Sequence, residues 1–89
     1  MSQALQQRAK DFLARPVPKG IKYVKDSIAE RILETYAKAG SLKADAELAE
    51  LLELCVMETE AAIDSHKGEA SAYFEQSAAL LKDIQVELG

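Results

Sequence analysis

The sequence predicts an all-α protein, a small antiparallel helical bundle with three long helices and a short N-terminal helix. Apolar residues recur at the 3.6-residue period of a helix through most of the chain. No segment alternates apolar and polar residues as a half-buried strand does. Chain breaks are confined to residues 15–20, Gly40 and Gly68. Eighty-nine residues are enough for one domain with a single core.

A short helix is expected over residues 1–14, with Ser2 as a candidate cap. Its thin apolar stripe consists of Leu5, Ala9 and Phe12. A short helix with so little apolar surface is marginal alone, so we expect it to cover an end of the core or to fray. Residues 15–20 form a linker, because each proline disfavours helical geometry in the residue before it.

The second helix is expected over residues 21–39. Gly40 follows it as a left-handed cap, and Lys38 in the last turn favours the helix dipole. The residues predicted to share its apolar face are Ile21, Val24, Ile28, Ile32, Thr35, Tyr36 and Ala39.

The third helix is expected over residues 45–67, capped by Asp45 and ended by Gly68. His66 and Lys67 then fall in its last turn. Its inward stripe is expected to contain Leu48, Leu51, Leu52, Cys55, Thr59, Ala62 and Ile63.

The fourth helix is expected over residues 69–88. One of its faces gathers Ala70, Tyr73, Phe74, Ser77, Leu80, Leu81, Ile84 and Leu88. Short connections between helices favour antiparallel neighbours, so the three long helices are expected to run up, down and up.

Charge divides the chain into two unlike parts. Residues 1–43 hold nine Lys/Arg and four Asp/Glu (net +5), whereas residues 44–89 hold two and eleven (net −9). Basic and acidic helices that attract each other would explain this asymmetry, and nucleic-acid binding would also use the basic half. That second interpretation uses Arg8, Lys10, Arg15, Lys19, Lys22, Lys25 and Arg31, with Tyr23 nearby. The overall pI near 4.9 opposes a general affinity for phosphate.

No residue pattern indicates a catalytic group, a cofactor site or a metal site. Cys55 lies on the inward stripe, where a thiol is inert, and His66 lies about 16 Å further along the same helix. One Cys and one His exclude an intramolecular disulfide and a zinc constellation. A lone His before Lys67 and Gly68 invites comparison with phosphotransfer bundles, although those present their His in mid-helix.

The candidate contact face lies on the outward side of the third helix. Leu54, Met57 and Ala61 fall there on a helical wheel, beside Glu50 and Glu53. An apolar strip rimmed by carboxylates is typical of a surface that binds another helix or a protein partner. Partial coverage by the first helix is the alternative.

A domain of this size without a disulfide or metal often relies on association. We therefore expect a protein partner, a homodimer or both. No apolar run is long enough to span a membrane, and the free thiol with no export signal predicts a cytoplasmic location.

The layout, with a helix start DAELAELL at Asp45, resembles the small antiparallel bundles of bacteriocin immunity proteins. The resemblance is architectural, covers residues 28–88 loosely and assigns no residue a role. The sequence thus predicts a non-enzymatic protein–protein interaction module of the adaptor, inhibitor, antitoxin or immunity type. The alternatives are a nucleic-acid-associated regulator using the basic N-terminal half and a His phosphotransfer-like bundle.

Overall fold

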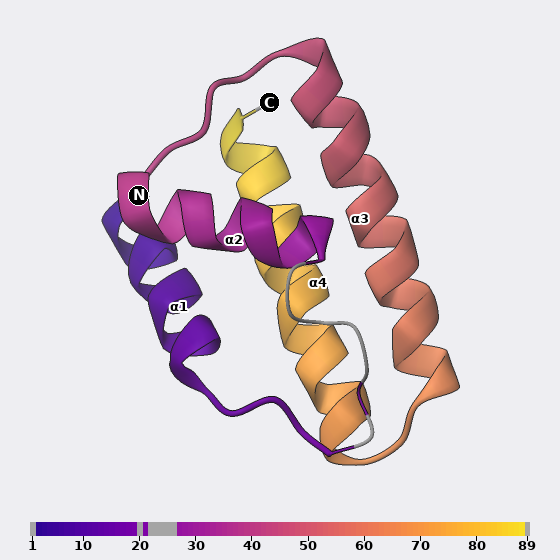
Figure 1. The fold of residues 1–89 in the computed structure, drawn as a ribbon. Helices are drawn as coiled ribbons and strands as arrows, with labels where there is room; N and C mark the ends of the chain where they lie inside the picture. Colours follow the sequence, from indigo (N-terminus) through magenta and orange to yellow (C-terminus); the bar gives the residue numbers. More distant parts are fainter. Residues whose placement is uncertain (1, 20, 22–26, 89) are drawn as a thin grey trace.

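A computed structural model describes residues 2–19, 21 and 27–88, and these form four helices and no strand (Figure 1). The helices are α1 (Ser2–Ala14), α2 (Ile28–Ala39), α3 (Ala46–Ser65) and α4 (Glu69–Leu88). The predicted all-α class, a small helical bundle, is confirmed.

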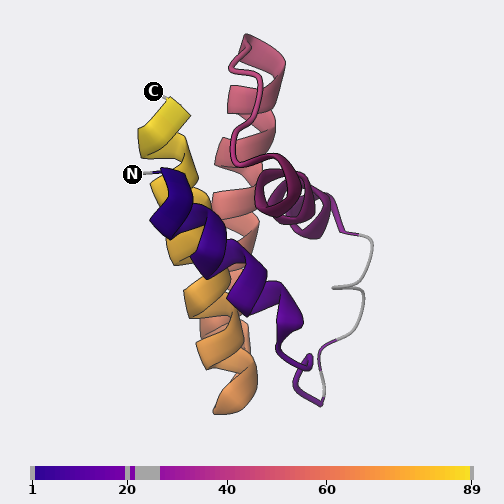
Figure 2. The ribbon, with the colours of Figure 1, turned by 90° about the vertical axis from the view of Figure 1, so that its left-hand side faces the viewer.

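The two long helices, α3 and α4, run antiparallel and share the most extensive interface (Figure 1). On the other side of α4 lies α1, which also packs against α2. Figures 1 and 2 together show that α2 crosses the other three helices at a steep angle. The up-down-up order predicted for three long helices therefore fails at α2, and α1 takes the position beside α4.

The start of α2 differs from the predicted helix over residues 21–39. The helix begins at Ile28, and the Ser27 Oγ accepts a 3.1 Å hydrogen bond from the Glu30 backbone N–H. Ser27 and Glu30 form the S-x-x-E pattern of a helix start, which the longer apolar period obscured. Ile21 is not helical, and the predicted helical positions 22–26 lie outside the described residues.

The end of α2 follows the prediction. Gly40 has a left-handed conformation (φ 77°), and its N–H donates to the Tyr36 carbonyl at 2.8 Å. The buried face is rotated from the predicted one, however. It contains Ile32, Leu33, Tyr36 and Ala37, whereas Ile28, Thr35 and Ala39 are exposed.

At the start of α3, the Asp45 carboxylate accepts a 2.8 Å hydrogen bond from the Leu48 N–H, so the predicted cap is confirmed. The predicted end of this helix, residue 67, lies two residues beyond the observed end. The helix stops at Ser65, and His66 is extended (φ −126°, ψ 168°). The Ser65 and His66 side chains donate to the Ala62 carbonyl, competing with continuation of the helix.

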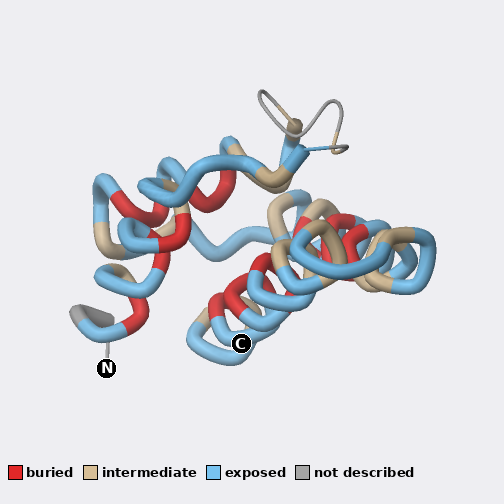
Figure 3. The backbone as a smooth tube through the Cα atoms, turned by 90° about the horizontal axis from the view of Figure 1, so that it is seen from below, coloured by how far each residue is buried: buried red, intermediate tan, exposed pale blue. Residues whose placement is uncertain are grey.

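The core draws on all four helices. Its largest fully buried side chains are Tyr36, Leu33, Leu52, Leu81 and Ile84. The stripe on α1 is also buried: Leu5, Ala9 and Phe12 are exposed by 9%, 0% and 5%. Of the two expected alternatives, the first helix therefore covers and contributes to the core, and it does not fray. Figure 3 shows the buried residues on the helix sides that face one another.

Candidate functional site

The predicted contact face on α3 is open to solvent. Leu54 and Met57 are 50% and 62% exposed, and Ala61, Glu50 and Glu53 are exposed as well. The alternative, coverage by α1, does not apply, because α1 packs on α2 and α4 at the opposite side of the molecule from α3 (Figure 1). We call Leu54, Met57 and Ala61 the outer strip.

A further exposed apolar side chain, which the sequence pattern did not single out, lies on α4 near the ion pair that joins α3 and α4. Lys82 of α4 forms an ion pair with Glu60 of α3, so these two residues lie on the same side of the helix pair. Met57 lies one turn from Glu60 and Val86 one turn from Lys82, in the same direction because the helices are antiparallel. Val86 is 79% exposed. The antiparallel packing therefore places Val86 at about the level of Met57 along the two helices.

The helix that carries the outer strip is strongly acidic. Its 20 residues contain six carboxylates and no Lys or Arg. They are Glu47, Glu50, Glu53, Glu58, Glu60 and Asp64. Among the described residues, Glu60 is the one member of this set in an ion pair. In the described part of the chain, the other five carboxylates therefore form no ion pair with Lys or Arg.

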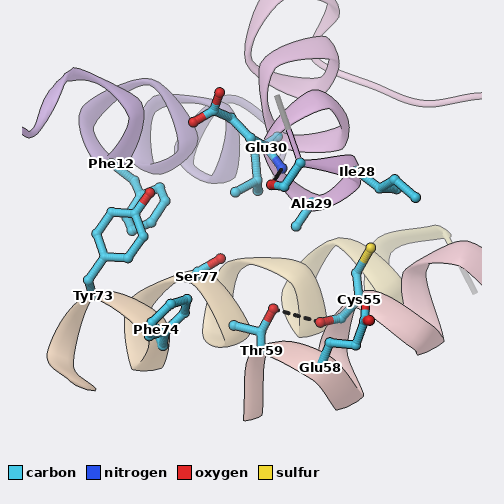
Figure 4. A pocket seen from close by; sticks show the side chains of 12 residues that line it. Phe12, Ile28, Ala29, Glu30, Cys55, Glu58, Thr59, Tyr73, Phe74 and Ser77 are labelled. Carbon is cyan, nitrogen blue, oxygen red and sulfur yellow. Dashed lines mark hydrogen bonds between the residues drawn. The ribbon is translucent and has the colours of Figure 1, made fainter. Parts of the chain in front are cut away.

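A separate cavity of about 230 Å³ lies where the N-terminus of α2 faces α1, α3 and α4 (Figure 4). Its walls include the Phe12, Tyr73 and Phe74 rings, and the Phe12 and Tyr73 ring centroids are 4.8 Å apart. Thr59 Oγ1 also lines it but donates to the Cys55 carbonyl at 2.6 Å. Helix packing alone forms this cavity, so sequence periodicity could not locate it.

Two titratable groups of this cavity, the Cys55 thiol and the Tyr73 phenol, have raised pKa values. Burial, reinforced by the nearby Glu58 carboxylate, raises the pKa of the Cys55 thiol. Burial, reinforced by Glu30, raises the pKa of the Tyr73 phenol. A raised pKa disfavours the thiolate and phenolate at neutral pH, so neither group is activated as a nucleophile.

His66 closes the end of α3. Its Nδ1 lies 2.8 Å from the Ala62 carbonyl oxygen, and since a carbonyl only accepts, Nδ1 carries the hydrogen. Its ring also packs on Phe74, with centroids 4.8 Å apart. This placement differs from the mid-helix position of a phosphotransfer His. Within the described residues, no group of three or more Asp, Glu, His or Cys could hold a metal ion.

The basic residues are dispersed over several elements. Arg8 of α1 forms a 2.7 Å ion pair with Asp83 of α4, which agrees with the expected attraction between basic and acidic helices. Arg15, Lys19 and Lys67 line one hollow between the linker and the start of α4. Lys10 and Arg31 are exposed elsewhere on α1 and α2, and the predicted Lys22, Tyr23 and Lys25 lie outside the described residues.

Of the helices in the described part of the chain, none combines the length and apolar character needed to cross a membrane. Comparison with known protein families, with curated proteins and with solved structures found no match to this chain.

Proposed function

We propose that this protein is a non-enzymatic interaction module that binds another protein through the outer strip of α3. The observation that carries the proposal is the exposure of Leu54 (50%) and Met57 (62%) on a helix face that α1 leaves uncovered. Large apolar side chains grouped on one exposed face mark contact surfaces more often than scattered ones do. A small adaptor, inhibitor, antitoxin or immunity-type protein fits this description.

The remaining sites favour binding over catalysis. The thiol and phenol in the cavity are stabilised in their neutral forms, and His66 uses one ring nitrogen to cap α3. A buried, unpaired Cys55 agrees with a reducing compartment, so the proposal includes a cytoplasmic location.

Met57→Glu tests the proposal, because it places a charge in the centre of the strip without touching the core. Val17→Glu is the matched control, since Val17 is an exposed apolar residue (44%) in the linker. We expect Met57→Glu to abolish capture of the natural partner, or to convert a homodimer to monomer, with the circular dichroism spectrum unchanged. Capture and sedimentation that stay identical to the wild type would overturn the proposal.

The hollow lined by Arg15, Lys19 and Lys67 is the one feature that favours the nucleic-acid alternative. Replacing these three residues with Gln should then remove salt-dependent binding to labelled duplex DNA or RNA. No shift of either probe by the wild-type protein at low salt would exclude that function.

A further inference from the structure

We infer that the segment bound by this protein is a positively charged amphipathic helix, lying along the outer strip and reaching Val86 of α4. The inference rests on the proposed function, because it specifies the partner of the same face. Three arguments support it: the shape of the apolar surface, the charge around it, and the repulsion expected in a two-fold dimer of this chain.

The shape of the apolar surface suits a helix. Leu54, Met57 and Ala61 are spaced i, i+3 and i+7, so they form a straight row about 10 Å long at 1.5 Å per residue. Val86, a single exposed apolar side chain, lies on the adjacent helix one turn from Lys82, the partner of Glu60. An exposed apolar row of this kind can accept the apolar stripe of an amphipathic helix.

The charge around the strip selects a basic partner. Glu50, Glu53 and Asp64 are exposed on the outward side of α3, and that helix has no cation of its own. Lys82, on the adjacent helix, is already paired with Glu60. A partner with Lys or Arg beside its apolar stripe would pair with these carboxylates, which favours both encounter and register.

The same charges disfavour a second copy of this chain as the occupant. A two-fold dimer places one surface patch against itself. The carboxylates of Glu50, Glu53 and Asp64 would then lie close to the same carboxylates of the other protomer. Like charges placed opposite each other oppose association, whereas a basic helix removes the conflict.

Three synthetic 20-residue peptides provide the probe. The first places Leu at i, i+3, i+4 and i+7 positions with Lys beside them, the second replaces every Lys with Glu, and the third scrambles the first. Binding is measured by fluorescence anisotropy, and the bound face is located by ¹H–¹⁵N chemical-shift changes. We expect the basic amphipathic peptide to bind at least roughly tenfold more tightly than the others. We also expect salt to weaken its binding and its shifts to centre on the outer strip and Val86.

Two double variants separate local from overall charge. Glu50→Gln/Glu53→Gln removes two charges beside the strip, and Glu34→Gln/Glu75→Gln removes two exposed charges from α2 and α4. Of the two double variants, we expect only Glu50→Gln/Glu53→Gln to weaken binding of the basic peptide. The single variant Met57→Gln should weaken it as well. Equal weakening by both pairs, or shifts centred elsewhere, would overturn the inference.

Failure of this inference can be told apart from failure of the proposed function. Met57→Glu could abolish binding of a natural partner that contacts the strip through an acidic or non-helical segment. That outcome would overturn only the inference. Self-association that Met57→Gln abolishes would likewise identify the occupant as a second copy. A partner retained by Met57→Glu would overturn both.

Discussion

The Tyr36 hydroxyl donates a hydrogen bond to the Glu87 carboxylate, which joins the last turn of α2 to the last turn of α4. Tyr36 is fully buried, and the residues are 51 positions apart in the sequence. The steep crossing of α2 over α4 is therefore fixed by a polar contact as well as by apolar packing.

Replacing Tyr36 with Phe should lower the free energy of unfolding by about 1–2 kcal/mol, because it removes a hydrogen bond to a charged acceptor while keeping the ring. Urea denaturation followed by circular dichroism measures the change. Glu87→Gln keeps an acceptor oxygen and should cost less. Equal stability of Tyr36→Phe and the wild type would show that the bond contributes nothing.

Stability should fall at alkaline pH. Burial, followed by the hydrogen bond and charge of Glu87, raises the pKa of Tyr36 to about 12, whereas an unfolded tyrosine has a pKa of about 10. Above about pH 10 the unfolded chain loses this proton while the folded chain retains it, so the unfolding free energy decreases as pH rises. The raised pKa values of Cys55 and Tyr73 act in the same direction.

Urea titrations at successive pH values measure this slope. In Tyr36→Phe the decrease above pH 10 should be smaller, by at most about 1.4 kcal/mol per pH unit. An unchanged slope in that variant would assign the alkaline loss to other groups.

Gly40→Ala should destabilise the protein more than Gly68→Ala. Both glycines have positive φ (77° and 62°), so alanine is strained at either position. At Gly40 the new Cβ would also lie 3.1 Å from Gln6 Oε1, whereas nothing lies within 4 Å at Gly68. Gln6 Nε2 donates to the Ala37 carbonyl at 2.8 Å, and displacing it would disturb the α1–α2 contact.

We expect about 1 kcal/mol for Gly68→Ala and a larger loss for Gly40→Ala, measured by thermal unfolding. The reverse order would mean that Gln6 moves aside without cost.

Phe12→Ala should destabilise the fold by about 3–5 kcal/mol, because Phe12 is 5% exposed and leaves a cavity beside Tyr73. Val17→Ala, on the exposed linker, should change stability by less than about 0.5 kcal/mol. Chemical denaturation compares the two. A small effect of Phe12→Ala would favour the alternative in which α1 frays.

Ser27→Ala should cost about 1 kcal/mol, because it removes the acceptor for the Glu30 N–H at the start of α2. Ser41→Ala, at an exposed serine beyond the helix end, is the control. Ser27→Asp should retain most of the stability. Equal effects of the two alanine variants would contradict a capping role.

Helix ends and the exposure of single residues could be predicted from the sequence where one side chain determines them. Asp45 and Gly40 set helix ends through a single cap each, and the exposure of Leu54 and Met57 followed from the helical wheel. The start of α2 was missed because the apolar period continues upstream of Ser27, so the capping serine competes with a pattern that looks uninterrupted.

Tertiary relationships were not readable in the same way. Nothing in the α1 segment shows that Leu5 and Phe12 find partners on both α2 and α4, since the stripe is thin in isolation. Val86 also looks like an ordinary exposed residue until the antiparallel contact of α3 and α4 sets it at about the level of Met57 along the two helices. These relationships depend on helix crossing angles, which periodicity does not encode.

Cys55 is the single cysteine of the chain, and it is 3% exposed between α2, α3 and α4. A thiol reagent therefore gains free access to Cys55 when these helices separate. The rate of alkylation under native conditions, divided by the rate for a free thiol, gives the equilibrium constant for that opening when closing is fast. Cys55 can therefore report local opening of the core without an added label.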